Sequence, residues 1–139
     1  MSESSQIPTE PPAAARSSIV VGYSSKAEGR AALHRAVSEA HLRGSDLIVV
    51  HTSPDVELVE LRAELTAAGV PHEIRAAPDS LDPAEELLNA AEQSDAEFIV
   101  IGLRRRSPVG KLLLGSNAQR VLLDAACPVL AVKAEAEAD

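Results

Sequence analysis

Aromatic residues are almost missing from this 139-residue chain, which has one Phe, one Tyr and no Trp. Its core must therefore be aliphatic, and it offers no aromatic platform on which the bases of single-stranded nucleic acid could stack. Cysteine is as scarce as the aromatic residues. The single cysteine, Cys127, cannot form an internal disulfide, so we expect a reducing, cytoplasmic location.

The chain also has few basic residues and lacks long apolar runs. Lys and Arg number 13 against 21 Asp and Glu, for a net charge of −8. This balance argues against DNA or an anionic membrane as a partner. No apolar run approaches the ~20 residues needed to span a bilayer. The first residues lack the apolar stretch of a secretory signal.

What is present is the pattern of a single α/β domain. We expect residues 1–17 to be disordered, residues 18–133 to form the domain and residues 134–139 to form a solvated acidic tail. Apolar strands alternate with amphipathic helices, which predicts a mostly parallel sheet with helices on both faces. The predicted strands are 18–23, 46–52, 71–78, 97–102 and 128–133. In such sheets ligands bind at the carboxyl ends of the strands, where the strand order reverses.

Helix starts and an edge strand are also indicated by short motifs. The segment 71–78 is bounded by prolines, which sheets tolerate at an edge. Three residue pairs match a capping box, in which a side chain at the helix start and one three residues later satisfy backbone N–H groups. These pairs are Ser25 with Glu28, Asp82 with Glu85, and Ser116 with Gln119.

The segment 103–115, LRRRSPVGKLLLG, is the most informative part of the chain. It holds four cations and no acid in an otherwise acidic protein, and it leads into the start of a helix, where free N–H groups attract anions. The cations are Arg104, Arg105, Arg106 and Lys111. A phosphate cradle and a solvated basic turn both fit this pattern, and the position directly after a buried strand favours the cradle.

Sharper catalytic and metal motifs are absent. The segment around Gly110 and Lys111 departs from the P-loop pattern at two places, and no G-x-G-x-x-G follows the first strand. The four histidines are not clustered as zinc ligands would be and are expected at the surface, with His51 closest to the ligand edge. Cys127 is expected to be a packed thiol and not a nucleophile.

The residues resemble the universal stress protein family over roughly 17–133. The resemblance rests on IVVGY at 19–23, on FIVIG at 98–102, and above all on GKLLLGSNAQRVLLDAACPVLAVK at 110–133. It implies a three-layer, Rossmann-like α/β/α fold with a five-stranded sheet in the order 3-2-1-4-5. It also implies a homodimer through the last strand, Pro128–Lys133, which would otherwise be an exposed apolar edge.

In nucleotide-binding members of that family an Asp ends the first strand and a G-x2-G-x9-G-[S/T] loop holds the phosphates. Gly102, Gly115 and Ser116 match this loop, but Arg105 replaces the middle glycine and Ser24 stands in place of the Asp. Arg in a left-handed conformation would cost ~1–2 kcal/mol. Together with the basic segment, the resemblance leads us to expect phosphate contacts from Gly102, Arg104, Arg105, Arg106, Gly115 and Ser116. It implies a base and ribose side formed by Gly22, Ser24 and Val50.

Three hypotheses about function follow. The first is a stress-response regulator that binds ATP, AMP, cyclic AMP or a similar phosphorylated molecule at the carboxyl edge of the sheet. It would need no obligatory cofactor, and the role of Mg²⁺ is left open. The second, favoured by the departures at Ser24 and Arg105, is a dimeric interaction module without a nucleotide. An ATP-hydrolysing enzyme is least favoured, because no general base is visibly placed.

Overall fold

The structure is a computed structural model that describes residues 16–51, 55–77, 82–105 and 112–134. Strands and helices alternate within these ranges, as the sequence predicts. In chain order they are β1 Ser18–Tyr23, α1 Ala27–Arg43, β2 Asp46–His51, α2 Asp55–Ala68, β3 His72–Ala76, α3 Pro83–Ser94, β4 Phe98–Arg105, β5 Leu112–Leu113, α4 Ser116–Asp124 and β6 Val129–Lys133.

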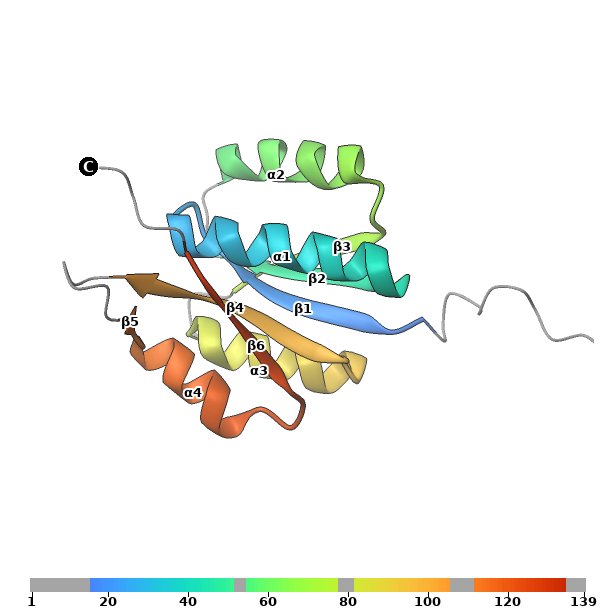
Figure 1. Cartoon of the computed structure of the whole chain (residues 1–139). Coiled ribbons are helices and arrows are strands. Elements are labelled where there is room, and N and C mark those ends of the chain that lie inside the picture. The colour runs from blue at the N-terminus through green and yellow to red at the C-terminus, as the bar shows by residue number, and fades with distance from the viewer. Residues whose placement is uncertain (1–15, 52–54, 78–81, 106–111, 135–139) are drawn as a thin grey trace, which may run out of the picture.

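Five of the strands pair in parallel in the order β3-β2-β1-β4-β6 (Figure 1). This confirms the predicted 3-2-1-4-5 order, with β6 as the fifth strand of the prediction, and β3 lies at an edge as expected. The strand order reverses between β1 and β4. The crevice at the carboxyl ends of these two strands is therefore where an open α/β sheet binds its ligand.

Helices cover both faces of the sheet. Figure 1 shows α1 and α2 on one side and α3 and α4 on the other. Successive residues of β1 alternate between the two layers, as the two-residue repeat of a strand requires. Ile19 and Val21 pack with α1 and α2, Val20 packs with α3, and all three are fully buried. Both cores are almost wholly aliphatic, as the composition predicts.

The end of β4 differs from the prediction. Residues 103–105 were expected to begin a loop, but β4 continues to Arg105 and pairs antiparallel with β5. Arg104 pairs with Leu113, and Arg105 with Leu112. Hydrogen bonding between these backbones explains the difference, because it satisfies polar groups that a loop would leave to water.

Helix starts agree with the sequence in one case of three. Asp82 caps α3, and its carboxylate accepts a hydrogen bond from the Glu85 N–H at 2.9 Å. The boxes at Ser25 and Ser116 are wrong, because α1 begins after Lys26 and α4 after Gly115, neither with a side-chain cap. The apolar residues of α4 are not all buried: Val121 is fully buried, but Leu122 is 39% exposed.

The ends of the described chain are anchored to the sheet. Ser17, placed by the prediction in the disordered lead-in, accepts a hydrogen bond from the Asp46 N–H at 2.9 Å. Ala134, assigned to the solvated tail, is only 5% exposed. Residues 1–15 and 135–139 lie outside the described residues. No helix in the described part of the chain is long and apolar enough to cross a membrane.

The first turn of α1 lies directly on the ends of β1 and β4, and glycines make this contact possible. A Cβ on Gly102 would lie 2.6 Å from the carbonyl carbon of Glu28 and closer still to its oxygen. A Cβ on Gly29 would likewise overlap the backbone of Ser24. Real Cβ atoms do not come this close to backbone, so any larger residue at Gly102 must push α1 away from β4.

We therefore expect Gly102→Ala to lower the free energy of unfolding by about 1–3 kcal/mol, the usual cost of overpacking. The matched control is Gly115→Ala, since a Cβ there meets no atom within 4 Å. Because Gly115 caps α4, the control should still cost up to about 1 kcal/mol. Urea unfolding measures both values, and equal costs would contradict the close contact.

Candidate functional site

A hollow of about 320 Å³ opens at the carboxyl ends of β1, β2 and β4. It lies at the reversal of strand order, where the topology predicts a ligand. The first turns of α1, α3 and α4 close its sides. Its lining residues are Gly22, Tyr23, Ser24, Lys26, Glu28, Gly29, Val50, His51, Pro83, Leu87, Ile101, Gly102, Arg104, Asn117, Ala118 and Val121.

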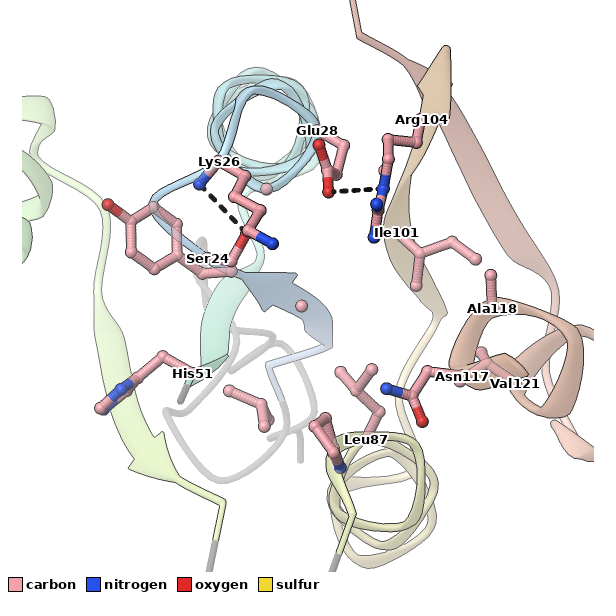
Figure 2. A pocket seen from close by; sticks show the side chains of 16 residues that line it. Ser24, Lys26, Glu28, His51, Leu87, Ile101, Arg104, Asn117, Ala118 and Val121 are labelled. Carbon is pink, nitrogen blue, oxygen red and sulfur yellow. Dashed lines mark hydrogen bonds and ion pairs between the residues drawn. The ribbon is translucent and has the colours of Figure 1, made fainter. Parts of the chain in front are cut away.

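One side of the hollow is apolar and the other is polar. Val50, Leu87 and Val121 belong to the same buried cluster, and each is at most 5% exposed. Figure 2 shows Ser24, Lys26, Glu28 and Arg104 around the opposite side, with Asn117 beside Val121 on α4. A pocket with an apolar wall and a few polar groups suits a ligand that has a flat apolar part and a charged part.

Most of the predicted site residues come together here. All three residues predicted for the base and ribose side, Gly22, Ser24 and Val50, line this hollow, as do Gly102 and Arg104 from the phosphate set. Gly115 and Ser116 line a second, adjoining hollow that shares Glu28, Gly102, Arg104, Asn117 and Ala118 with the first.

Of the remaining predicted cations, only Arg105 is placed, and by its backbone alone. The backbone of Arg105 pairs with Leu112 in the antiparallel ladder, while Arg106 and Lys111 lie outside the described residues. Among the described residues Asp95 is the only non-glycine with a positive φ. Arg105 therefore does not adopt the left-handed conformation for which a cost was expected, so its backbone carries no such strain.

The basic segment is not free of acids, which corrects the charge argument made from sequence. Arg104 Nε lies 3.3 Å from Glu28 Oε2, and the Glu28 side chain is only 18% exposed. The acid is supplied by α1, far away in the chain, so a search within residues 103–115 could not find it. An anion that reaches Arg104 must compete with this carboxylate.

The glycines of the site have packing reasons of their own. Gly102 is required where α1 meets β4, and a Cβ on Gly22 would press on Leu87 Cδ1 at 3.2 Å. A glycine at position 102 is therefore needed for packing whether or not phosphate binds. Its match to the phosphate-loop motif is weaker evidence for phosphate binding for that reason. Gly115 is different, because the space around its Cα is open.

The start of α4 is an anion-attracting feature of the described part of the site. Gly115 is its N-cap and makes no side-chain cap hydrogen bond. The first N–H groups of an α-helix have no carbonyl partner within the helix. These groups carry the positive end of the helix dipole and adjoin the second hollow. Asn117, in the first turn, adds an amide side chain to both hollows.

Ion pairs hold α4 against α3. Arg120 Nη2 lies 3.2 Å from Glu85 Oε2, and Arg120 Nη1 lies 3.5 Å from Asp82 Oδ2. The charge of Glu85, then that of Asp82, raises the pKa of the guanidinium. Asp82 also caps α3, so one cluster joins the starts of two helices that border the hollow.

Sequence reasoning missed several site residues. Lys26, Glu28 and Asn117 were not predicted as site residues, although Lys26 and Glu28 come soon after the first strand and Asn117 follows Ser116, which is the signal that could have found them. His51, given a weak role, is 3% exposed and lines the hollow, so it is not a surface histidine. Within the described ranges no three His, Cys, Asp or Glu residues cluster as metal ligands.

Cys127 fits the interpretation of a packed thiol. It contacts the cluster formed by α3, α4 and the sheet, and it does not line either hollow. Burial raises its pKa above the usual value for a thiol. A raised pKa leaves less thiolate at neutral pH, which is the opposite of what a nucleophile needs.

Fold and site together define a doubly wound α/β domain with a ligand hollow at its strand reversal. The sequence model of the universal stress protein family matches residues 55–133. A universal stress protein of Mycolicibacterium smegmatis is 48% identical over 126 residues, covering 83% of this chain and 96% of the relative. The chain belongs to the universal stress protein family.

Two solved structures of similar fold contain nucleotides. One is the universal stress protein from Archaeoglobus fulgidus in complex with dAMP. It is 29% identical with a TM-score of 0.58, and the match covers 84% of this chain and 98% of that one. The other is a universal stress protein in complex with cAMP. It is 26% identical with a TM-score of 0.66, covering 86% of this chain and 98% of that one.

Proposed function

We propose that this protein binds an adenine nucleotide in the hollow at the ends of β1, β2 and β4. One observation carries the proposal. The hollow with the apolar wall adjoins the hollow at the start of α4, whose first N–H groups have no partner within the helix. The complexes of the two related structures with dAMP and cAMP support the same ligand class. The volume, about 320 Å³, is at the lower end of small-molecule pockets.

The geometry suggests how the ligand lies. The base packs against Val50, Leu87 and Val121, which are apolar and held rigidly by the sheet and helices. The Ser24 hydroxyl accepts the Lys26 N–H at 3.3 Å and can still donate to a ribose oxygen. The phosphate lies at Gly115 and Ser116, where the N–H groups at the start of α4 can donate to it.

Glu28 lowers the affinity that we expect the site to have for a nucleotide. Its carboxylate lines both hollows and already neutralises Arg104, so the described site offers an anion less positive charge than the sequence suggests. We expect modest affinity and readily exchanged ligand. This suits a regulator that responds to nucleotide level in the cytoplasm, acting by binding and without catalysis.

A homodimer through β6 is part of the same proposal. In the described part of the chain β6 pairs on one side only, with β4, and its Val129, Leu130 and Val132 are half-buried. An apolar edge of this kind is stabilised by pairing with another strand. The edge lies away from the hollow, so two copies can pair with both sites open.

Filling the hollow should weaken binding. Ala118 lines both hollows on α4, and we expect Ala118→Phe to weaken AMP, ATP and cyclic AMP binding at least about tenfold, a loss of about 1.4 kcal/mol. The matched control is Leu123→Phe, on the same helix but 81% exposed and outside both hollows. Isothermal titration calorimetry measures the affinities, and nucleotide released on denaturing the fresh protein shows what it carries.

Two outcomes of that titration would contradict the proposal. Equal affinities in the two variants would place the nucleotide elsewhere. No heat from the wild-type protein at millimolar nucleotide would favour the dimeric interaction module, for which Ser24 and the Glu28–Arg104 pair are the supporting observations. Phosphate release from ATP above that of Ala118→Phe would contradict binding without catalysis.

Removing the charge of Glu28 should strengthen binding. We expect Glu28→Gln to raise nucleotide affinity about fivefold, or about 1 kcal/mol, because Arg104 becomes free and a repelling carboxylate is lost. Glu92→Gln is the control, since Glu92 is exposed on α3 and lines neither hollow. Unchanged or weaker binding in Glu28→Gln would show that the carboxylate does not compete with the phosphate.

A further inference from the structure

Lys26 is a positive charge at the mouth of the first hollow whose side chain the proposed function does not use. Apart from His51, the described residues that line this hollow include two cations, Lys26 and Arg104, and one acid, Glu28. Arg104 is paired with Glu28 at 3.3 Å. Lys26 has no ion-pair partner within the described ranges, so it gives the lining a surplus positive charge.

The Lys26 side chain stands next to the place proposed for the ribose. Its backbone N–H donates to the Ser24 hydroxyl at 3.3 Å, and Figure 2 shows the lysine side chain beside Ser24, turned toward the hollow. Lys26 does not line the second hollow, where Gly115 and Ser116 are proposed to hold the phosphate. Because α1 and α4 lie on opposite faces of the sheet (Figure 1), the lysine and the start of α4 reach a ligand from two sides.

The end of β1 carries no acid that would repel a second phosphate. Residues 23–25 are Tyr-Ser-Ser, and Lys26 follows them. In doubly wound dinucleotide-binding folds an acidic residue binds a free ribose hydroxyl, whereas a basic residue nearby accommodates a phosphate on the ribose. A serine hydroxyl and a lysine ammonium both donate hydrogen bonds to phosphate, and the bond from the ammonium is charge-assisted.

We propose that the preferred ligand is an adenosine bisphosphate, with one phosphate at the 5′ position and a second on the 2′ or 3′ oxygen of the ribose. Lys26 binds the second phosphate, and Ser24 donates a hydrogen bond to it. This inference rests on the proposed function, which places the base and the 5′-phosphate. The second phosphate needs no further volume inside the hollow of about 320 Å³, because Lys26 is exposed at its mouth.

Calorimetric titration of the full chain with AMP, adenosine 2′,5′-bisphosphate and adenosine 3′,5′-bisphosphate tests the proposal. We expect the wild-type protein to bind one bisphosphate about tenfold more tightly than AMP, a gain of about 1.4 kcal/mol. Lys26→Gln should lose this preference, while its affinity for AMP should change less than about twofold, because exposed charges away from the ligand are screened. The better of the two bisphosphates identifies the ribose oxygen that faces Lys26.

The matched control is Arg30→Gln, which removes one positive charge from the same helix. Arg30 is exposed, lines neither nucleotide hollow and has no ion-pair partner in the described part of the chain. This variant should keep the wild-type preference. Raising the salt from about 0.1 M to about 1 M shortens the range of charge interactions from about 10 Å to about 3 Å, so the preference should shrink.

The inference and the proposed function fail in different ways. Equal affinities of the wild-type protein for AMP and both bisphosphates would overturn the inference and leave the proposed function in place. A preference that Lys26→Gln retains would also overturn it, because the second phosphate would then lie elsewhere. If none of the three nucleotides binds, the proposed function and the inference are both contradicted.

Discussion

The close contact between the first turn of α1 and the ends of β1 and β4 is the constraint on which the site depends. Gly29 and Gly102 allow it, because a Cβ at either position would overlap backbone atoms of the neighbouring element. The contact sets the height of α1 above the sheet. It brings Glu28 to Arg104 and leaves Ser24 and Lys26 at the mouth of the hollow. The contact of α1 with β1 and β4 thus determines both the shape of the site and its charge.

That contact also decides the electrostatics. The basic segment, considered by itself, predicts a strongly cationic phosphate cradle, but α1 brings a carboxylate to its first arginine. What remains for an anion is Lys26, which lines the hollow, and the start of α4, held in place by the pairs of Arg120 with Glu85 and Asp82. Backbone N–H groups at a helix start are fixed in direction, and at the start of α4 no side chain caps them. We infer that the helix, more than the arginines, determines phosphate affinity.

The layers and strand order could be predicted because they depend on local apolar patterns, such as SIVVGY and EFIVIG, and on a resemblance covering most of the chain. The site was predicted only in part. Gly22, Ser24 and Val50 follow from strand ends, but the Glu28–Arg104 pair joins residues far apart in the chain. The β4–β5 pairing and the exposure of Leu122 are likewise tertiary properties. No local pattern encodes them.

The most direct test of the central claim is to locate the nucleotide by nuclear Overhauser effects between AMP and the methyl groups of the full chain. Binding in the proposed hollow predicts contacts from adenine protons to Val50, Leu87 and Val121, and none to Ala27 or Ala31, which lie on α1 outside both hollows. Contacts confined to other methyl groups, or none from a protein saturated with AMP, would contradict the account.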